Sequence, residues 1–280
     1  MQNDCKSAVV TPLYKNKGDT DNLNNYSGIS VLPQIAKLFE KIMAKQITCF
    51  LNANNLLSTS QNVFRSAHNC ESSLHEILTE INQVRSKRLI GLLIFIDFRK
   101  AFDVVDSKLL LIKLSKYGFD ALSIRLLRNY FSNRMQFVKI DEFQSSLLQI
   151  ILGVPLGSFL GPLLFLIFIN DIVIYLNEFI SKLFADDTTI FIKGDNLVEV
   201  MEKFQQSITK LLNWCSLYRI YINWEKTKVM FTSNKRIIAF PTKEALQVTV
   251  DKVGRIEVVQ EFKLLGLTID KGLKFTNLNT

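Results

Sequence analysis

Two adjacent aspartates stand out as side chains that could do chemistry. The stretch Phe184-Ala185-Asp186-Asp187 places them between an apolar approach and a β-branched, apolar exit. Runs of this length and composition favour short strands, so the pair is expected at the tip of a tight hairpin. Two like charges this close resist ionisation unless a cation lies between them. A plain turn is the alternative, because aspartate is common in turns.

A third aspartate, Asp97, follows the most apolar strand of the sequence, Leu89 to Ile96. The nearly continuous apolarity of that strand predicts burial on both faces. A carboxylate at a strand end, facing a carboxylate pair on a neighbouring strand tip, suits a two-metal phosphoryl-transfer site. Hard Mg²⁺ takes oxygen ligands and keeps several waters, so two or three carboxylates and substrate phosphates suffice. Two such ions, about 3.5–4 Å apart, stabilise the attacking and leaving oxygens of an in-line displacement.

The composition is that of a globular protein with a sizeable core. The chain has 280 residues, 48% of them hydrophobic, which is enough for one large domain or two small ones. A formal net charge of +8 favours a polyanionic partner such as nucleic acid, although a solvated basic surface explains it equally well. The polar start, Met1 to Lys6, has no apolar signal-peptide core. Four cysteines without paired spacing indicate reduced thiols in an intracellular protein: Cys5, Cys49, Cys70 and Cys215.

One stretch, Leu147 to Ile169, has no charged residue and is long enough to span a bilayer. The segments Gly153 to Gly157 and Gly161-Pro162 break it into a short strand, a loop and a half-length helix. No Lys/Arg cluster closely flanks it, as an oriented span would show. We therefore predict that this stretch does not span a membrane and that the protein has no membrane partner.

Helices interleave with short strands, several of them joined as hairpins, which predicts an α+β fold. Expected helices cover residues 34–52, 70–87, 109–116, 121–131, 163–176 and 197–214. Expected strands cover 9–14, 89–96, 135–140, 146–152, 180–192 with the aspartate turn inside, 220–222, 229–231 and 262–270. In the first helix, helical spacing predicts an apolar face made of Ile35, Leu38, Phe39, Ile42 and Ile47.

Several short motifs occur along the chain in one order. They are Asn25-Tyr26…Ile29-Ser30, Gln61…Phe64-Arg65, Ile96 to Asp103, Gly153 to Ser158 with Leu160-Gly161-Pro162, Ile169-Asn170-Asp171, Phe184 to Thr188, Asn223…Lys226-Thr227-Lys228, and Leu264-Leu265-Gly266…Ile269-Asp270. Each motif is weak alone, but the set in this order is very specific. It resembles the reverse transcriptase of non-LTR (LINE- and jockey-like) retrotransposons over almost the whole chain.

The resemblance implies a right-hand polymerase with fingers in residues 1–90 and a palm in residues 91–280. The palm would hold an antiparallel sheet packed on helices, a helical fingers-like insertion at about 107–140 and a primer-grip-like unit at about 260–272. The chain would begin just inside the fingers and stop about where a thumb begins, so the thumb would be largely missing. There would be no room for an endonuclease domain.

The resemblance also assigns the chemistry. Asp97 and Asp186 would bind two Mg²⁺ ions, with Mn²⁺ as a possible substitute, and Asp187 would complete the acidic site. Lys226 would lie near the leaving pyrophosphate, although a solvated surface lysine is an equal alternative for that residue alone. The activity implied is RNA-directed DNA polymerisation, which adds dNMP to a primer 3′-hydroxyl. The partners implied are an RNA template, a DNA primer and dNTPs, in the nucleus or cytoplasm, with no predicted protein partner.

The remaining substrate-binding roles follow from the same resemblance. Phe102 would lie beneath the sugar and exclude a 2′-hydroxyl, with core packing as the alternative. Arg65 would lie near template or triphosphate, with a surface ion pair as the alternative. The loop from Pro155 to Ser158 would pass under the template and incoming base, where glycine permits close approach of the backbone. Its alternative is a helix-entry turn with Ser158 as N-cap. In the Pro155–Ser158 loop, the residues assigned to substrate binding are Pro155, Gly157 and Ser158. Elsewhere, Leu265 and Gly266 would hold the primer end.

Four departures from the family pattern suggest a different outcome. Ser27-Gly28 replaces the usual Arg-Pro, Asn62-Val63 replaces Phe-Gly, Leu156 replaces Gln, and Phe184 replaces the commoner Tyr. The first and third remove a cation and a polar contact from the expected substrate site. The alternative function is therefore a catalytically inactive retroelement remnant, or a nucleic-acid-binding module with the same fold.

Overall fold

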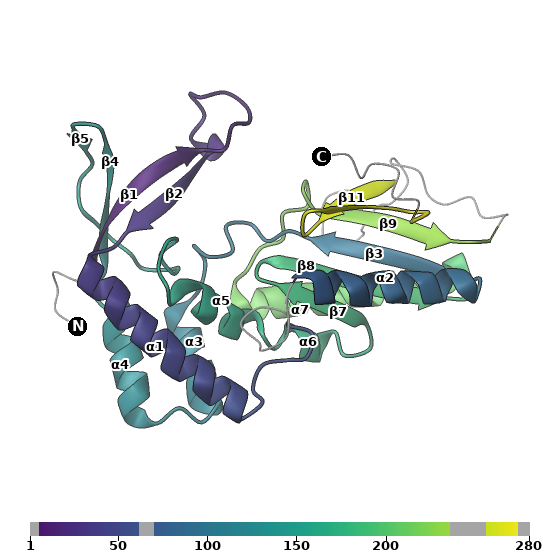
Figure 1. Cartoon of the computed structure of the whole chain (residues 1–280), viewed down its shortest axis with the longest axis horizontal. Helices are drawn as coiled ribbons and strands as arrows, with labels where there is room; N and C mark the ends of the chain where they lie inside the picture. The colour runs from purple at the N-terminus through teal and green to yellow at the C-terminus, as the bar shows by residue number, and fades with distance from the viewer. Residues whose placement is uncertain (1–5, 62–69, 236–255, 274–280) are drawn as a thin grey trace. The chain divides into compact units, whose positions relative to one another are not determined.

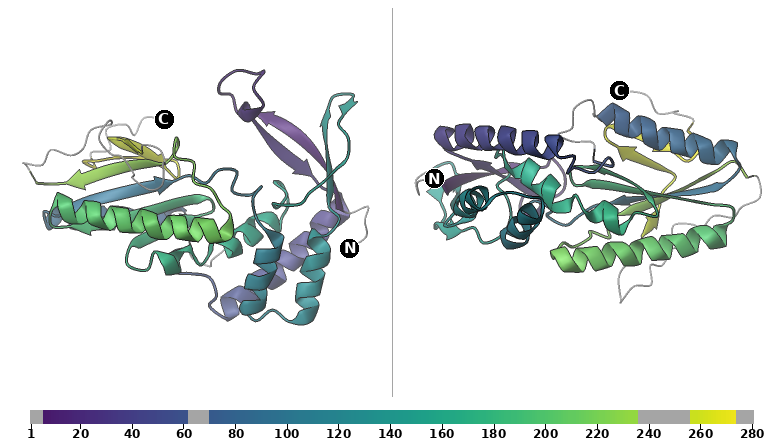
Figure 2. Two further views of the ribbon diagram at one scale, coloured as in Figure 1. Left: turned by 180° about the vertical axis from the view of Figure 1, so that it is seen from behind. Right: turned by 90° about the horizontal axis from the view of Figure 1, so that it is seen from below.

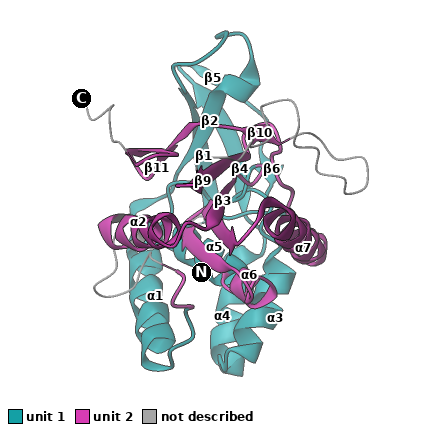
Figure 3. Ribbon diagram, turned by 90° about the vertical axis from the view of Figure 1, so that its right-hand side faces the viewer, with its two compact units in different colours: residues 1–57, 100–169 teal, residues 58–99, 170–280 magenta. Residues whose placement is uncertain are grey.

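The computed structural model describes residues 6–61, 70–235 and 256–273. The chain forms two compact units, shown in different colours in Figure 3. Unit 1 holds residues 1–57 and 100–169, and unit 2 holds residues 58–99 and 170–280. Each unit is therefore built from segments far apart in the sequence. The division into fingers (1–90) and palm (91–280) is a functional assignment, and it stays a prediction.

Unit 2 is centred on a five-stranded sheet with β3 in the middle (Figure 1). β3 is antiparallel to both of its neighbours, β8 and β9, and all seven of its residues are buried. This confirms the expected strand and its burial on both faces. The strand order is β10 (Glu257–Val258), β9 (Lys228–Ser233), β3 (Ile90–Ile96), β8 (Asp187–Gly194) and β7 (Ile180–Phe184).

Two helices cover the opposite faces of this sheet, α2 (Cys70–Ser86) and α7 (Leu197–Tyr218) (Figure 2). Asn196 caps α7 by accepting a hydrogen bond from the Glu199 amide, and Arg219 ends it in the left-handed conformation. The buried face of α7 contains Val200, Phe204, Ile208 and Leu211. On the other face of the sheet, a core cluster joins α2 to the strands: Ile77, Ile81, Val84, Leu93, Phe95, Phe191, Met230, Leu264 and Ile269. The sheet packed on helices that the family resemblance implied is confirmed, and it is antiparallel except at its edge, where β10 runs parallel to β9.

The described residues of unit 2 also form a short helix and a hairpin. The helix is α6 (Ile172–Tyr175), and the hairpin joins β11 (Glu261–Leu264) to β12 (Leu267–Asp270). The Phe262 ring stacks on the Phe95 ring of the central strand, with 3.9 Å between centroids and an interplanar angle of 5°. This aromatic pair fastens the hairpin to the sheet.

Unit 1 combines a second sheet with four helices. The sheet has the order β2-β1-β4-β5, with β6 also paired to β4; β1 runs antiparallel to β2 and parallel to β4. Asp106 and Asp120 cap two helices by accepting hydrogen bonds from first-turn amides. The strands are β1 (Ser7–Tyr14), β2 (Tyr26–Val31), β4 (Met135–Ile140), β5 (Phe143–Gln144) and β6 (Leu148–Gln149). The helices are α1 (Gln34–Ala53), α3 (Ser107–Lys116), α4 (Ala121–Phe131) and α5 (Gly161–Ile169), and a 3-10 turn covers Leu23–Asn25.

The helix predicted at residues 34–52 exists, but most of its predicted apolar face is wrong. Ile35, Leu38 and Ile42 are 67%, 59% and 51% exposed. The buried residues are instead Ala36, Glu40, Met43, Ile47 and Leu51, so only Ile47 of the predicted face is buried. The error has a physical cause: this stripe contains a glutamate, which hydropathy assigns to solvent, although its carboxylate has hydrogen-bond donors inside the unit.

The helix predicted at residues 163–176 forms two pieces, α5 and α6, because polar side chains interrupt it. The side chain of Asn170 accepts a hydrogen bond from the Ser58 amide, and the Asp171 carboxylate accepts from Trp214 and Tyr218. These contacts explain the Asn170-Asp171 motif as a structural one. The strand expected at 220–222 reduces to a single bridge between Ile222 and Phe98. Within the described ranges, no helix combines the length and the apolarity needed to cross a bilayer.

Candidate active site

Asp97 is held at the end of β3 by the turn that precedes β9. Its carbonyl accepts a hydrogen bond from the Asn223 amide at 2.8 Å, and its amide donates to Thr227 Oγ1 at 3.3 Å. The Asn223 side chain also hydrogen-bonds the Asp97 carboxylate. Thr227 is fully buried. The turn therefore fixes both the backbone and the side chain of Asp97.

The predicted aspartate hairpin is present. β7 and β8 pair up to Phe184 and Asp187, which leaves a two-residue turn of Ala185 and Asp186. Ala185 adopts a φ of 53°, in the left-handed region that non-glycine residues rarely enter. Ile96 of β3 lies opposite Thr188 of β8. Because these two strands are antiparallel, the register brings Asp97 and Asp187 to the same edge of the sheet.

The three aspartates interact electrostatically. Partial desolvation raises the pKa of Asp187, which is still exposed at the start of β8, and the charges of Asp186 and Asp97 raise it further. Burial also raises the pKa of Asp97, and Asp186 adds to that rise, whereas Lys226 and Asn223 oppose it. Lys226 Nζ lies 4.0 Å from Asp97 Oδ2. The ionised carboxylates therefore repel each other at a place where a cation would stabilise them.

Asp97, Asp187 and Lys226 line one pocket of about 230 Å³. Thr188 also lines it, and its buried hydroxyl oxygen has no hydrogen-bond partner among the described residues. Carboxylate and hydroxyl oxygens are donors that a hard cation prefers, so the donor set fits Mg²⁺. In the described part of the chain, however, no three acidic, histidine or cysteine side chains lie close enough together to hold a metal ion. The metal ligand set of Asp97, Asp186 and Asp187 stays a prediction.

The predicted primer-grip unit is the β11–β12 hairpin of the same unit. Its two turn residues are Leu265 and Gly266, with φ of 49° and 88°. Positive φ at both central residues suits a two-residue hairpin turn, and glycine takes such an angle without strain. Phe262 and Leu264, just before the turn, line the Asp97 pocket. The hairpin therefore contributes directly to the wall of the candidate site.

In unit 1, the loop after Leu152 is held against two other segments. The Gly153 amide donates to the Val105 carbonyl and the Val154 amide to the Phe102 carbonyl, both at 2.9 Å. A side chain at Gly153 would lie 2.8 Å from the Asp103 carbonyl oxygen. The Phe102 ring packs on the Phe165 ring, 4.5 Å between centroids. Phe102 thus has the core contact that was its alternative role, and its place beneath a sugar stays a prediction.

The next residues of this loop lie against β2. The Leu156 carbonyl accepts a hydrogen bond from the Ser30 amide at 2.6 Å. Gly157 has a φ of +101°, and a Cβ there would lie 2.6 Å from the Ser30 carbonyl oxygen. Gly157 therefore lies close to the backbone of the chain's own strand β2, and its expected place under the template and incoming base stays a prediction. Ser158 Oγ accepts from the Gly161 amide at 2.6 Å, so the helix-entry role of Ser158 is present too.

Six of the assigned residues belong to unit 2 and four to unit 1, while Arg65 lies outside the described residues; of the six, Asp97, Asp187 and Lys226 share one pocket. The first set is Asp97, Asp186, Asp187, Lys226, Leu265 and Gly266, and the second is Phe102, Pro155, Gly157 and Ser158. Sequence reasoning did not assign site roles to Asn223, Thr188 and Thr227. A signal for two of them existed, since Asn223 and Thr227 belong to the motif that contains Lys226. The buried hydroxyl of Thr188 had no such signal, because threonine is ordinary in a strand.

Comparison with known proteins gives three results that agree. The family described as "Reverse transcriptase (RNA-dependent DNA polymerase)" matches residues 14–269. The RNA-directed DNA polymerase from mobile element jockey of Drosophila melanogaster is 25% identical over 97% of this chain. The probable RNA-directed DNA polymerase from transposon BS of the same organism is 26% identical over 96% of the chain. In each case the chain spans 30% of the length of the relative.

A solved structure supports the fold alone. The apo telomerase of Candida tropicalis, truncated from its C-terminal domain, superposes with a TM-score of 0.63 at 16% identity. The match covers 96% of this chain and 54% of the telomerase chain.

Proposed function

The chain belongs to the reverse transcriptase (RNA-dependent DNA polymerase) family, and on this premise we propose that it extends a DNA primer along an RNA template. The observation that carries the proposal is the pocket shared by Asp97, Asp187 and Lys226. These residues come from β3, from β8 and from the turn before β9, and the pairing of β3 with both strands fixes their spacing.

In the proposed reaction, the primer 3′-oxygen forms a bond to the α-phosphorus of a dNTP. The bond from that phosphorus to the bridging oxygen breaks, pyrophosphate leaves, and the hydroxyl proton passes to water. Divalent cations held by Asp97, Asp186 and Asp187, two Mg²⁺ or else Mn²⁺, would neutralise the charge on the phosphate oxygens. Desolvation raises the pKa of Asp97 and Asp187, and the neighbouring carboxylates raise it further; a bound cation would offset both costs of ionisation, which supports cation binding.

Three further tasks fall to other assigned residues. The exposed Lys226 would place its ammonium group near the leaving pyrophosphate. Phe102 would select dNTPs over ribonucleotides, and the Leu265-Gly266 turn would hold the primer end. The net charge of +8 suits a nucleic-acid partner, because phosphate contacts supply much of the affinity for such chains. A location in the nucleus or cytoplasm goes with these substrates.

Primer extension by the purified 280-residue chain tests the proposal. The assay uses an RNA template, a DNA primer, dNTPs and Mg²⁺. The double variant Asp186→Asn, Asp187→Asn should lower the extension rate at least about 100-fold, since it removes two charges from the site. The matched control is Asp141→Asn, an exposed aspartate of the β4–β5 turn in a left-handed conformation that asparagine also accepts.

Extension by the wild type and the control, with loss in the double variant, supports the proposal. Salt-dependent RNA binding without extension by any of the three would contradict it. That second outcome would favour the inactive nucleic-acid-binding alternative, to which the Ser27-Gly28 and Leu156 departures point.

A further inference from the structure

A fully buried glutamate, Glu40, lies in the middle of α1 at 0% exposure. Both of its carboxylate oxygens have a donor. Tyr130 Oη donates to Oε1 at 2.7 Å, and the Phe159 amide donates to Oε2 at 2.9 Å. The carboxylate therefore ties α4 and the end of the Pro155–Phe159 loop to α1, all within unit 1.

Tyr130 is the second member of this network and is also fully buried. Burial raises the pKa of its hydroxyl, and Glu40 raises it further, so the hydroxyl keeps its proton and remains a donor. Ser158 hydrogen-bonds the same hydroxyl. The Arg134 guanidinium lies 4.7 Å from the centroid of the tyrosine ring, where it restrains the ring. Tyr130 therefore reaches the loop at Ser158 as well as through Glu40.

The loop is thus anchored at both ends by different means. Its first half is fixed by the backbone bond between Leu156 and Ser30, and its second half by the Glu40 and Tyr130 side chains. Burying a carboxylate costs desolvation free energy, which is offset only when its hydrogen bonds have good geometry. An apolar side chain at position 40 would avoid this cost. Stability alone does not account for a buried glutamate at this position, whereas control of the loop conformation does.

We propose that Glu40 is a positioning residue of the polymerisation site. Through the Phe159 amide and Tyr130, it holds the Pro155–Phe159 loop in the conformation that receives template and incoming nucleotide. The role of the loop in nucleotide binding rests on the proposed function, whereas the positioning of the loop by Glu40 does not.

Three variants and two controls test the proposal in the 280-residue chain. Glu40→Leu removes both acceptors, and Tyr130→Phe removes one donor without changing the ring. Glu40→Gln is the conservative variant, because its amide oxygen accepts from Phe159 while its NH₂ donates to Tyr130. Leu51→Val perturbs the buried face of α1 away from the loop. Tyr14→Phe removes a tyrosine hydroxyl bond elsewhere in unit 1, the one to the Gly18 carbonyl.

Two measurements are made on each variant. Amide hydrogen exchange of the peptide covering residues 155–160 should speed up at least about tenfold in Glu40→Leu and Tyr130→Phe, and little in the controls. Steady-state primer extension should show KM for dNTP raised about 5- to 20-fold in these two variants with kcat changed less than about threefold. Glu40→Gln should stay within about threefold of wild type in both measurements.

The outcomes separate the two claims. If the wild type extends no primer, the proposed function fails, and hydrogen exchange alone then decides whether Glu40 positions the loop. Unchanged exchange of residues 155–160 in Glu40→Leu and Tyr130→Phe would overturn the positioning role. Equal changes of kcat and KM in these variants and in Leu51→Val would also overturn it, because a general loss of stability would then explain the effect.

Discussion

Replacing Gly157 by alanine should destabilise unit 1 more than a strained backbone alone can explain. Gly157 has a φ of +101°, an angle that costs an L-residue about 1–2 kcal/mol. In addition, the new Cβ would lie 2.6 Å from the Ser30 carbonyl oxygen, well inside the 3.4 Å at which ordinary van der Waals contact begins. Separating β2 from the loop to admit the methyl group is a case of overpacking, which costs about 1–3 kcal/mol. The expected loss of unfolding free energy is therefore about 2–5 kcal/mol.

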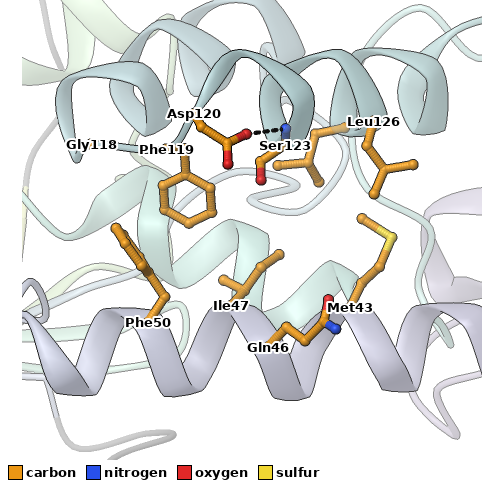
Figure 4. Close-up of a pocket in the computed structure, with 10 residues that line it drawn as sticks. Met43, Gln46, Ile47, Phe50, Gly118, Phe119, Asp120, Ser123 and Leu126 are labelled. Carbon is orange, nitrogen blue, oxygen red and sulfur yellow. Dashed lines mark hydrogen bonds between the residues drawn. The ribbon is translucent and has the colours of Figure 1, made fainter.

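Unit 1 also provides a matched control. Gly118 has a similar φ of +90°, but a Cβ there would meet only Phe50 Cζ at 3.9 Å, an ordinary contact. Gly118 and Phe50 both line the pocket of about 180 Å³ between α1 and the start of α4 (Figure 4). Gly118→Ala should therefore lose only the conformational part, about 1–2 kcal/mol.

Urea unfolding followed by circular dichroism, with hydrogen exchange to assign the transition to unit 1, measures both variants. The difference between them isolates the contact with Ser30 and should be about 1–3 kcal/mol. Equal losses, within about 0.5 kcal/mol, would refute the close approach of the loop to β2.

Two further predictions concern the acidic site. Asp187→Asn should raise the free energy of unfolding at pH 7 by a few tenths to about 1 kcal/mol after solvent screening. The pKa of Asp187 is higher in the folded than in the unfolded chain, so its ionisation destabilises the folded state as the pH rises above the unfolded value near 3.9. The gain should vanish below about pH 4 in thermal melts, and a gain independent of pH would contradict the electrostatic cause. Thr227→Val removes the acceptor of the Asp97 amide and should lower kcat in primer extension about tenfold. Thr227→Ser should restore it, and equal rates in the two variants would show that the hydroxyl does not position Asp97.

The sequence predicted the parts of the site whose signal is local. The apolar run that becomes β3 ends at Asp97, and the apolar approach and β-branched exit on either side of Asp186-Asp187 form the predicted hairpin. Both depend on residues adjacent in the chain, so periodicity and turn chemistry suffice to find them. The pairing of β3 with β8 and β9 joins residues far apart in the sequence, and the carboxylate chemistry suggested only that Asp97 faces the aspartate hairpin.

The errors fall where a polar side chain is satisfied by a distant partner. Glu40 looks solvent-facing from its type, and the predicted apolar face of α1 therefore avoided it, although its donors on α4 and the loop make it buried. Asn170 and Asp171 break a helix that hydropathy predicts to be continuous, because their partners are Ser58, Trp214 and Tyr218. No local pattern contains this information.

The central position of β3 has a consequence for how the protein is made. Ile90 pairs with Gly194 on one side and with Ser233 on the other, so the strand leaves the ribosome long before either neighbour exists. At about 5–20 residues per second, several seconds pass between the synthesis of β3 and that of β8. During this time an entirely apolar strand has α2 to pack on but no partner strand on either edge, and its edges are exposed to aggregation. Cells that express this chain at high level should therefore depend on chaperones that hold nascent hydrophobic segments.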